Sequence, residues 1–240
     1  MDPIVSLFKH RELLWQFLLR NVSSRHRGSV LGALWLVINP LLMLGLYVFA
    51  FGIVFGGRFT DSPDESTLEY ALGIFLGLNV LGLISGTIGA SPASIVGQPN
   101  FVKKVVFPLE VLPAAMTGAL AYDLLIGFGL CLMGILFLGP GLSLSVLYVP
   151  VILFPVFLMA FGLSWFFSAL GVFVRDVSQL GSFLGLALLY ASGVFYSAEK
   201  AQAAAPGIWQ FLQWNPILQV IDSLRQVTLW GGELDWWKVG

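Results

Sequence analysis

Charged residues are scarce in this sequence, since Asp, Glu, Lys and Arg together make up 10% of its 240 residues. A soluble globular domain carries roughly a quarter of charged residues, which keep its surface wetted. Apolar residues make up 58% of the chain and stand in long runs separated by short clusters of charge. Most of the surface must therefore face lipid. The formal net charge of −1 gives no basic footprint, so we expect no nucleic-acid partner.

Cysteine and histidine are also nearly absent. Cys131 is the single cysteine, so no intrachain disulfide can form, and its place in an apolar run indicates packing. The two histidines, His10 and His26, both lie in the basic N-terminal part. No apolar run offers metal-ligand spacing, paired acids or a nucleophile beside a base. The sequence therefore predicts no metal site and no catalytic residues, and a membrane-bound glycosyltransferase or polymerase is the weakest interpretation.

Five apolar runs are long enough to cross a membrane, because about 20 helical residues at about 1.5 Å each span a core of about 30 Å. They cover residues 28–57, 70–96, 111–138, 144–174 and 177–197, and the fifth is the least hydrophobic. Charges, Pro and Gly interrupt the chain between them. The sequence predicts an all-α polytopic membrane protein that forms a single transmembrane domain over residues 1–240.

Residues 1–24 are predicted to form an amphipathic helix at the cytoplasmic interface. Their charges exclude the apolar core of a cleavable signal peptide. One side of the helix carries Ile4, Leu7, Phe8, Leu14, Trp15 and Leu18, and the other side carries Lys9, Gln16 and Arg20. This pattern suits a helix that lies flat on lipid, and equally one that packs on its own protein. Both interpretations stay open.

Lys and Arg indicate the orientation of the chain. If five spans alternate, most of these residues fall on one side, which the positive-inside rule assigns to the cytoplasm of a cell inner membrane. They are Lys9, Arg11, Arg20, Arg25, Arg27, Lys103, Lys104 and Arg175. Residues 198–240 then lie outside as interfacial or re-entrant helices rich in Trp. Since five spans leave the C-terminus outside, we expect that a sixth span is missing after Trp236 and Trp237.

Small residues recur at the spacing that lets membrane helices approach closely. The pairs are Gly52 and Gly56, Gly73 and Gly77, Gly82 and Gly86, and Gly181 and Gly185. Each pair suits either an oligomer contact or packing within the chain, and the sequence favours neither.

Four local patterns follow one another along the chain. The first runs from Arg25-His26-Arg27-Gly28 to Trp35 and on to Asn39-Pro40, and the second from Phe101 through Lys103-Lys104 to Phe107-Pro108 and Pro113. The third is Phe173-Val174-Arg175-Asp176, and the fourth is Trp214-Asn215-Pro216 followed by Ser223-Leu224-Arg225. In this order and spacing they resemble the type-2 permeases of ABC transporters, in the branch that exports O-antigen, capsule and teichoic-acid polymers. Members of that family have six spans, so the sixth span is the one departure.

The resemblance implies a homodimeric permease that carries two copies of a separate ATP-binding cassette subunit. A lipid-linked polysaccharide would pass between the two protomers, which is a step of lipopolysaccharide biosynthesis when the cargo is O-antigen. The chain has no glycine loop of the Gly-x-x-x-x-Gly-Lys-Ser/Thr kind, so it cannot handle ATP itself. We therefore expect no enzyme activity and no cofactor on this chain, with ATP and Mg bound by the partner subunit.

Two cytoplasmic segments are candidates for coupling to that partner, because each can pass a push on to a rigid span. One is the N-terminal helix, continued by residues 25–27, and the other is the bend over residues 92–108. The candidate residues, including three near span ends, are Arg20, Arg25, Arg27, Pro99, Lys103, Lys104, Glu110, Arg175 and Asp176. The alternative is that the basic residues only set the topology and touch lipid phosphates.

Aromatic residues on the first and fifth runs are candidates for the transport path, which the resemblance places there. Sugar rings present apolar C–H faces, and aromatic surfaces suit them. The candidates are Trp35, Tyr47, Tyr190, Phe195 and Tyr196. Ordinary packing against lipid or core is the alternative for each of them.

Asp123 is the acid that lies deep inside a predicted span, where a carboxylate is costly unless it is neutral or has a partner. The favoured interpretation is a structural hydrogen bond to Tyr122, Ser168 or Thr117. The alternative function built on it is a proton-coupled secondary carrier, and an ABC exporter of a drug or small lipid is a further alternative to polysaccharide export.

Overall fold

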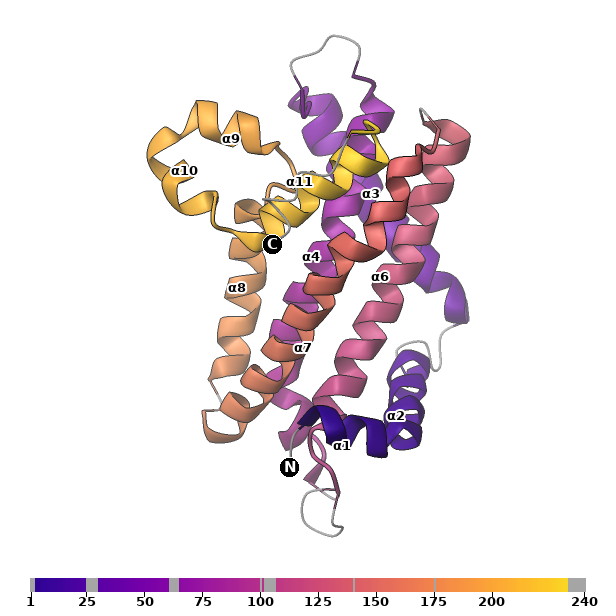
Figure 1. The fold of residues 1–240 in the computed structure, drawn as a ribbon, viewed down its shortest axis with the longest axis vertical. Helices are drawn as coiled ribbons and strands as arrows, with labels where there is room; N and C mark the ends of the chain where they lie inside the picture. The colour runs from indigo at the N-terminus through magenta and orange to yellow at the C-terminus, as the bar shows by residue number, and fades with distance from the viewer. Residues whose placement is uncertain are drawn as a thin grey trace. The chain divides into compact units, whose positions relative to one another are not determined.

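The computed structural model describes residues 3–24, 30–60, 65–99, 101, 107–139, 141–174 and 176–232. These ranges contain helices and no strand, which confirms the predicted all-α class. The helices in chain order are α1 (Pro3–Lys9), α2 (Arg11–Ser24), α3 (Trp35–Tyr47), α4 (Thr67–Val96), α6 (Val111–Leu138), α7 (Val149–Phe173), α8 (Val177–Ala191), α9 (Ala198–Ala204), α10 (Pro206–Leu212) and α11 (Pro216–Thr228) (Figure 1). Short turns of tighter helix, η1 (Gly32–Leu34) and η3 (Leu144–Tyr148), precede α3 and α7.

Four stretches within the described ranges are long and apolar enough to cross a membrane. They are Trp35–Val54, Thr67–Val96, Val111–Phe137 and Leu144–Phe173. The first joins α3 to η2 (Val48–Val54), a wider π-helical stretch in which the Phe55 N–H donates to the carbonyl of Ala50.

The fifth predicted span, residues 177–197, contains a shorter helix than expected. α8 has 15 residues and is therefore about 22 Å long, less than a hydrocarbon core of about 30 Å. The helix ends at Ala191 because the chain then turns at Gly193, whose φ of 66° suits a residue without a side chain. The crossing of the membrane by this segment stays a prediction.

The chain divides into two compact units. The first comprises Met1–Trp35, Gly82–Asp123 and Phe157–Leu186, and the second comprises Leu36–Leu81, Leu124–Val156 and Ala187–Gly240. The boundaries fall inside the long helices, so each unit contains parts of α4, α6, α7 and α8.

Hydroxyl groups join three helices inside the first unit. Ser164 on α7 donates from Oγ to the carbonyl of Pro113 on α6, at 3.1 Å. Ser91 on α4 lies 3.2 Å from the same Oγ and donates to the carbonyl of Thr87, at 2.6 Å. Hydroxyls buried between membrane helices need such partners, because lipid offers none.

Close packing in the second unit explains one of the glycine pairs. A Cβ atom on Gly73 of α4 would lie 2.5 Å from Cε2 of Phe59, and one on Gly77 would lie 3.3 Å from Nη2 of Arg225. Both glycines therefore make room for side chains of the same chain. For this pair the structure decides between the two open interpretations in favour of internal packing.

Candidate functional site

The helix α2 is attached to the chain through a small apolar cluster in the first unit. Phe17 is buried against Leu112 and Ala115 of α6. The rings of Phe101 and Phe107 meet the Phe17 ring edge-on, with centroids 5.3 and 5.4 Å away. Leu14, Leu18 and Leu109 pack around these residues. We call this cluster the α2 platform.

The α2 platform shows which side chains of the amphipathic N-terminal segment pack on the protein itself. Leu14 and Leu18, which were predicted to share one side with Trp15, pack against the chain's own Phe17 cluster. Trp15 stays 60% exposed and Phe8 of α1 stays 75% exposed. α2 therefore packs on its own protein with one face, while large apolar side chains of α1 and α2 remain available to lipid.

Arg20 connects α2 to the bend that was predicted to couple the chain to a partner. Its Nη2 donates to Oε1 of Gln98, at 2.9 Å, and its guanidinium lies 4.4 Å from the centroid of the Phe17 ring. Pro99 is exposed beside Gln98. The structure thus joins Arg20 of the α2 platform to the bend, 78 positions further along the chain.

For the other coupling candidates, no contact with the α2 platform is described. Glu110 contributes its backbone carbonyl, which accepts from Nε1 of Trp165 at 3.2 Å, and Asp176 is exposed before α8. Five candidates lie outside the described residues, namely Arg25, Arg27, Lys103, Lys104 and Arg175. Their roles stay predictions.

Three of the predicted path residues meet in the second unit. The ring of Phe195 lies 5.3 Å from that of Tyr47 and 6.4 Å from that of Tyr190. Phe51, in the π-helical stretch η2, stacks on Phe195 at 4.1 Å with an angle of 18° between the rings. Phe51 was not predicted, because a residue inside a long apolar run gives no sign in the sequence of which aromatic ring it will meet. We call these four residues the aromatic cluster.

The remaining two path candidates have different surroundings. The Tyr196 hydroxyl donates to the backbone carbonyl of Tyr190. Trp35 belongs to the first unit and is 38% exposed at the start of α3. This hydrogen bond places Tyr196 next to the aromatic cluster.

The guanidinium of Arg225 is enclosed by backbone carbonyls in the second unit. Nε donates to Gly73 at 3.1 Å, Nη1 donates to Gly193 at 2.7 Å and to Tyr196 at 3.2 Å, and Nη2 donates to Val194 at 2.6 Å. The side chain is 1% exposed. One residue of α11 therefore holds the turn after α8 against α4. We call it the Arg225 anchor.

The surroundings of Arg225 compensate for the burial of its charge only in part. Its guanidinium lies 3.8 Å from the centroid of the Phe59 ring, a favourable cation–π distance. Burial lowers the pKa of Arg225 to about 9, and the neighbouring carboxylates of Asp222 and Glu65 act in the opposite direction. Glu65 in turn accepts hydrogen bonds from the backbone N–H groups of Phe59 at 3.0 Å and Thr60 at 2.7 Å.

The sequence contained a sign of the Arg225 anchor that the prediction did not use. Arg225 was predicted only to lie in the outer interfacial segment, residues 198–240. Along α11, however, it follows Leu218 and Ile221 at intervals of three and four residues, so it falls on the apolar face of an amphipathic helix. A charge on that face indicates a buried, fully hydrogen-bonded group.

Asn215 joins the end of α8 to the start of α11. Its Oδ1 accepts from the backbone N–H of Ile217 at 3.0 Å, which caps α11, and its Nδ2 donates to the carbonyl of Ala191 at 2.9 Å. Pro216 follows at the first helical position, where it needs no hydrogen-bond partner. This pattern is part of the fourth motif that carried the family resemblance.

We expect Asn215→Ala to lower the free energy of unfolding by about 2 kcal/mol, roughly half from the lost cap and half from the carbonyl left without a donor. Asn215→Asp keeps the capping oxygen but replaces the donor by a carboxylate oxygen opposite the Ala191 carbonyl, so it should show at least half of the effect. The apparent melting temperature of the purified protein in detergent measures both. Equal melting of Asn215→Asp and the unmodified protein would show that the bond to Ala191 contributes nothing.

Asp123 is half-buried near the middle of α6, in the first unit. Of the three partners predicted for it, Ser168 donates its hydroxyl to the carbonyl of Trp165 on its own helix. Asp123 does take part in an interaction within the described part of the chain. The favoured structural role stays a prediction.

Comparison with known proteins identifies relatives over most of the chain. Residues 12–229 match the family model described as ABC-2 type transporter. The O-antigen export system permease protein RfbA of Myxococcus xanthus is 25% identical over 221 residues, which are 92% of this chain and 82% of the relative. A protein of the same name from Klebsiella pneumoniae is 25% identical over 213 residues, 88% of this chain and 78% of the relative.

A relative with a different printed role also matches. The daunorubicin resistance ABC transporter permease protein DrrB1 of Streptomyces coeruleorubidus is 28% identical over 217 residues. The match covers 85% of this chain and 71% of that protein. The relatives agree on a membrane permease and differ in the cargo that their names give.

Proposed function

This chain belongs to the ABC-2 type transporter family, and from this premise we propose that it is the permease subunit of an ATP-driven exporter of lipid-linked polysaccharide in the inner membrane. The observation that carries the proposal is the match, over about nine-tenths of the chain, to relatives named as O-antigen export permeases. The motifs that resemble the polysaccharide branch support the same cargo. Two copies of the chain, with their N-termini in the cytoplasm, would assemble with two ATP-binding subunits.

The α2 platform suits the transfer of force from such a partner. Phe17 packs on Leu112 and Ala115 in the first turns of α6, and Arg20 bonds to Gln98 just after α4. A push on α2 or on the bend would therefore reach both helices through packed side chains rather than through a free loop. On this proposal, the ATP-binding subunit presses on the platform when it closes on ATP.

The aromatic cluster suits contact with sugar rings. Tyr47, Phe51 and Phe195 offer flat apolar faces, and the hydroxyls of Tyr47 and Tyr190 add groups that can donate or accept. The adjoining π-helical stretch η2 has wider turns than an α-helix. Such a surface would let a polymer slide without a tight ionic site.

A drug exporter is the second candidate, and the match to DrrB1 favours it specifically. Both candidates require a separate ATP-binding subunit, so they differ only in cargo. Family membership favours either of them over a proton-coupled carrier built on Asp123.

The first test is purification of the tagged chain from gently solubilised native membranes. We expect an ATP-binding subunit to co-purify in about equal amount and the eluate to hydrolyse ATP. A chain that is purified alone and without ATPase activity would contradict an ABC exporter of either kind.

The cargo is tested in cells from which the gene for this chain is deleted. We expect lipid-linked polysaccharide to accumulate on the cytoplasmic side of the inner membrane, where enzymes added to inverted vesicles can reach it. Unchanged polymer at the cell surface, together with increased sensitivity to daunorubicin, would assign the chain to drug export instead.

A further inference from the structure

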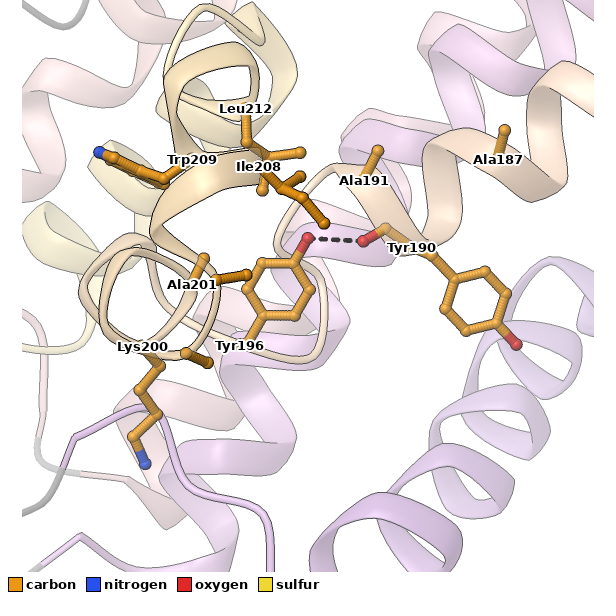
Figure 2. Close-up of a pocket in the computed structure, with 11 residues that line it drawn as sticks. Ala187, Tyr190, Ala191, Tyr196, Lys200, Ala201, Ile208, Trp209 and Leu212 are labelled. Atoms are coloured by element: carbon orange, nitrogen blue, oxygen red, sulfur yellow. Dashed lines mark hydrogen bonds between the residues drawn. The ribbon is translucent and has the colours of Figure 1, made fainter.

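A pocket of about 520 Å³ lies in the second unit, between the last turn of α8 and the hairpin formed by α9 and α10 (Figure 2). Its volume falls in the range of roughly 300–1,000 Å³ that is typical of small-molecule sites. Small and apolar side chains make most of its wall. Ala187 and Ala191 come from α8, Ala201 from α9, and Ile208 and Leu212 from α10.

Two polar side chains at this pocket, Tyr196 and Lys200, direct their hydrogen bonds elsewhere. The hydroxyl of Tyr196 donates to the carbonyl of Tyr190, the bond drawn in Figure 2. The ammonium of Lys200 points away from the pocket in the same view and donates to the carbonyls of Arg58 at 2.8 Å and Thr60 at 3.2 Å. The walls of the pocket offer few hydrogen-bond partners to water. A hydrocarbon occupant is therefore favoured over water.

Exposed side chains at the hairpin indicate which hydrocarbon could enter the pocket. Phe211 of α10 is 80% exposed, and Trp214, just after the end of α10, is 78% exposed. Large apolar side chains with Trp among them are typical of the layer where headgroups meet acyl chains. The hairpin that forms one wall of the pocket thus also carries a side chain suited to lipid contact, so bilayer lipid is the hydrocarbon expected beside the pocket.

From the lining, the volume and the exposed side chains at the hairpin, we propose that the pocket binds one acyl chain of a bilayer phospholipid. The chain fills the space between α8 and the α9–α10 hairpin and so holds the hairpin in place against α8. This role concerns the bilayer lipid and goes beyond the cargo of the transporter. It needs neither ATP nor a polysaccharide.

The test uses the purified complex in nanodiscs that contain phosphatidylethanolamine with a photoreactive diazirine near the end of one acyl chain. After irradiation without nucleotide or cargo, mass spectrometry of peptides locates the label. We expect labelled residues on the inner walls within 187–212, at Ala187, Ala191, Ala201 or Leu212. Ala201→Trp, which fills the pocket, should lose most of this label.

Ala203→Trp is the matched control, because Ala203 lies on the same helix, is exposed and does not line the pocket. It should keep the label of the unmodified protein. If Ala201→Trp cannot be isolated as a monodisperse complex, Ala204→Leu at the open rim replaces it, and a partial loss of label is expected. Monodispersity and ATPase activity are measured for every variant.

Three results would overturn the assignment. The first is label confined to the outer face at Phe211 and Trp214, and the second is full labelling of the pocket in the filled variant. The third is displacement of the label by a polyprenyl phosphate at a mole fraction where unlabelled phosphatidylethanolamine has no effect, since the pocket would then select an isoprenoid chain. Because no cargo is present, failure of polysaccharide export in cells leaves these results unaffected.

Discussion

Replacing Arg225 with Ala should cost this protein most of its stable, monodisperse yield. The substitution leaves the carbonyls of Gly73, Gly193, Val194 and Tyr196 without the donor that the structure shows for them. Breaking a buried charged network costs about 3–5 kcal/mol. For a chain of this size, each kcal/mol lowers the melting temperature by about 2–4 °C, so we expect a fall of about 6–20 °C. Size-exclusion chromatography of detergent-solubilised protein after graded heating measures it.

Two further variants make this prediction specific to the Arg225 anchor. Arg11→Ala is the matched control, because Arg11 is exposed on α2, and its melting should stay close to that of the unmodified protein. Arg225→Lys keeps a charge but replaces the planar fork with one ammonium, so it should be intermediate. Melting of Arg225→Ala within about 2 °C of the unmodified protein, which corresponds to about 1 kcal/mol or less, would show that the anchor is not needed for stability.

Replacing Phe17 with Ala should disconnect the permease from its ATP-binding partner. Removing a buried Phe costs about 3–5 kcal/mol, and the α2 platform consists of few residues, so α2 should detach locally while the spans stay folded. We expect the partner to be largely lost on purification and transport to fall by at least about tenfold, which corresponds to about 1.4 kcal/mol. Co-purification and cell-surface polymer measure the two effects.

Phe8→Ala provides the control for Phe17→Ala, since Phe8 lies on α1 and is 75% exposed. It should leave partner binding unchanged. If Phe17→Ala binds the partner and supports transport as the unmodified chain does, the α2 platform does not transmit force. If Phe17→Ala unfolds the whole protein, its melting curve will show it. Arg20→Ala then tests the same surface, because it removes the bond to Gln98 without opening the core.

The sequence could predict a membrane protein because the free energy of transferring each side chain into lipid is a local and nearly additive property. The scarcity of charge and the length of each run were sufficient to predict an all-helical membrane protein. The end of α8 was less readable, since the turn at Gly193 lies inside an apolar stretch that hydropathy alone continues to 197.

The candidate sites depended more on contacts between distant residues. Tyr47 and Phe195 were predicted as path residues from the resemblance, and the structure brings them together with Phe51. No periodicity in the sequence could pair residues almost 150 positions apart. The same holds for Phe17 and Leu112, whose contact decides which face of α2 is covered.

The sequence by itself determined that this protein lies in a membrane, because long apolar runs require lipid. The order of its motifs also indicated the permease family. Only the tertiary structure decided where a charged side chain could be buried inside this apolar protein. The charge of Arg225 lies inside the second unit because four backbone carbonyls, from two separate segments, converge on it. The position of Arg225 on the apolar face of α11 indicates in the sequence that it is buried, but backbone carbonyls are common to every residue, so the sequence does not show which of them it meets.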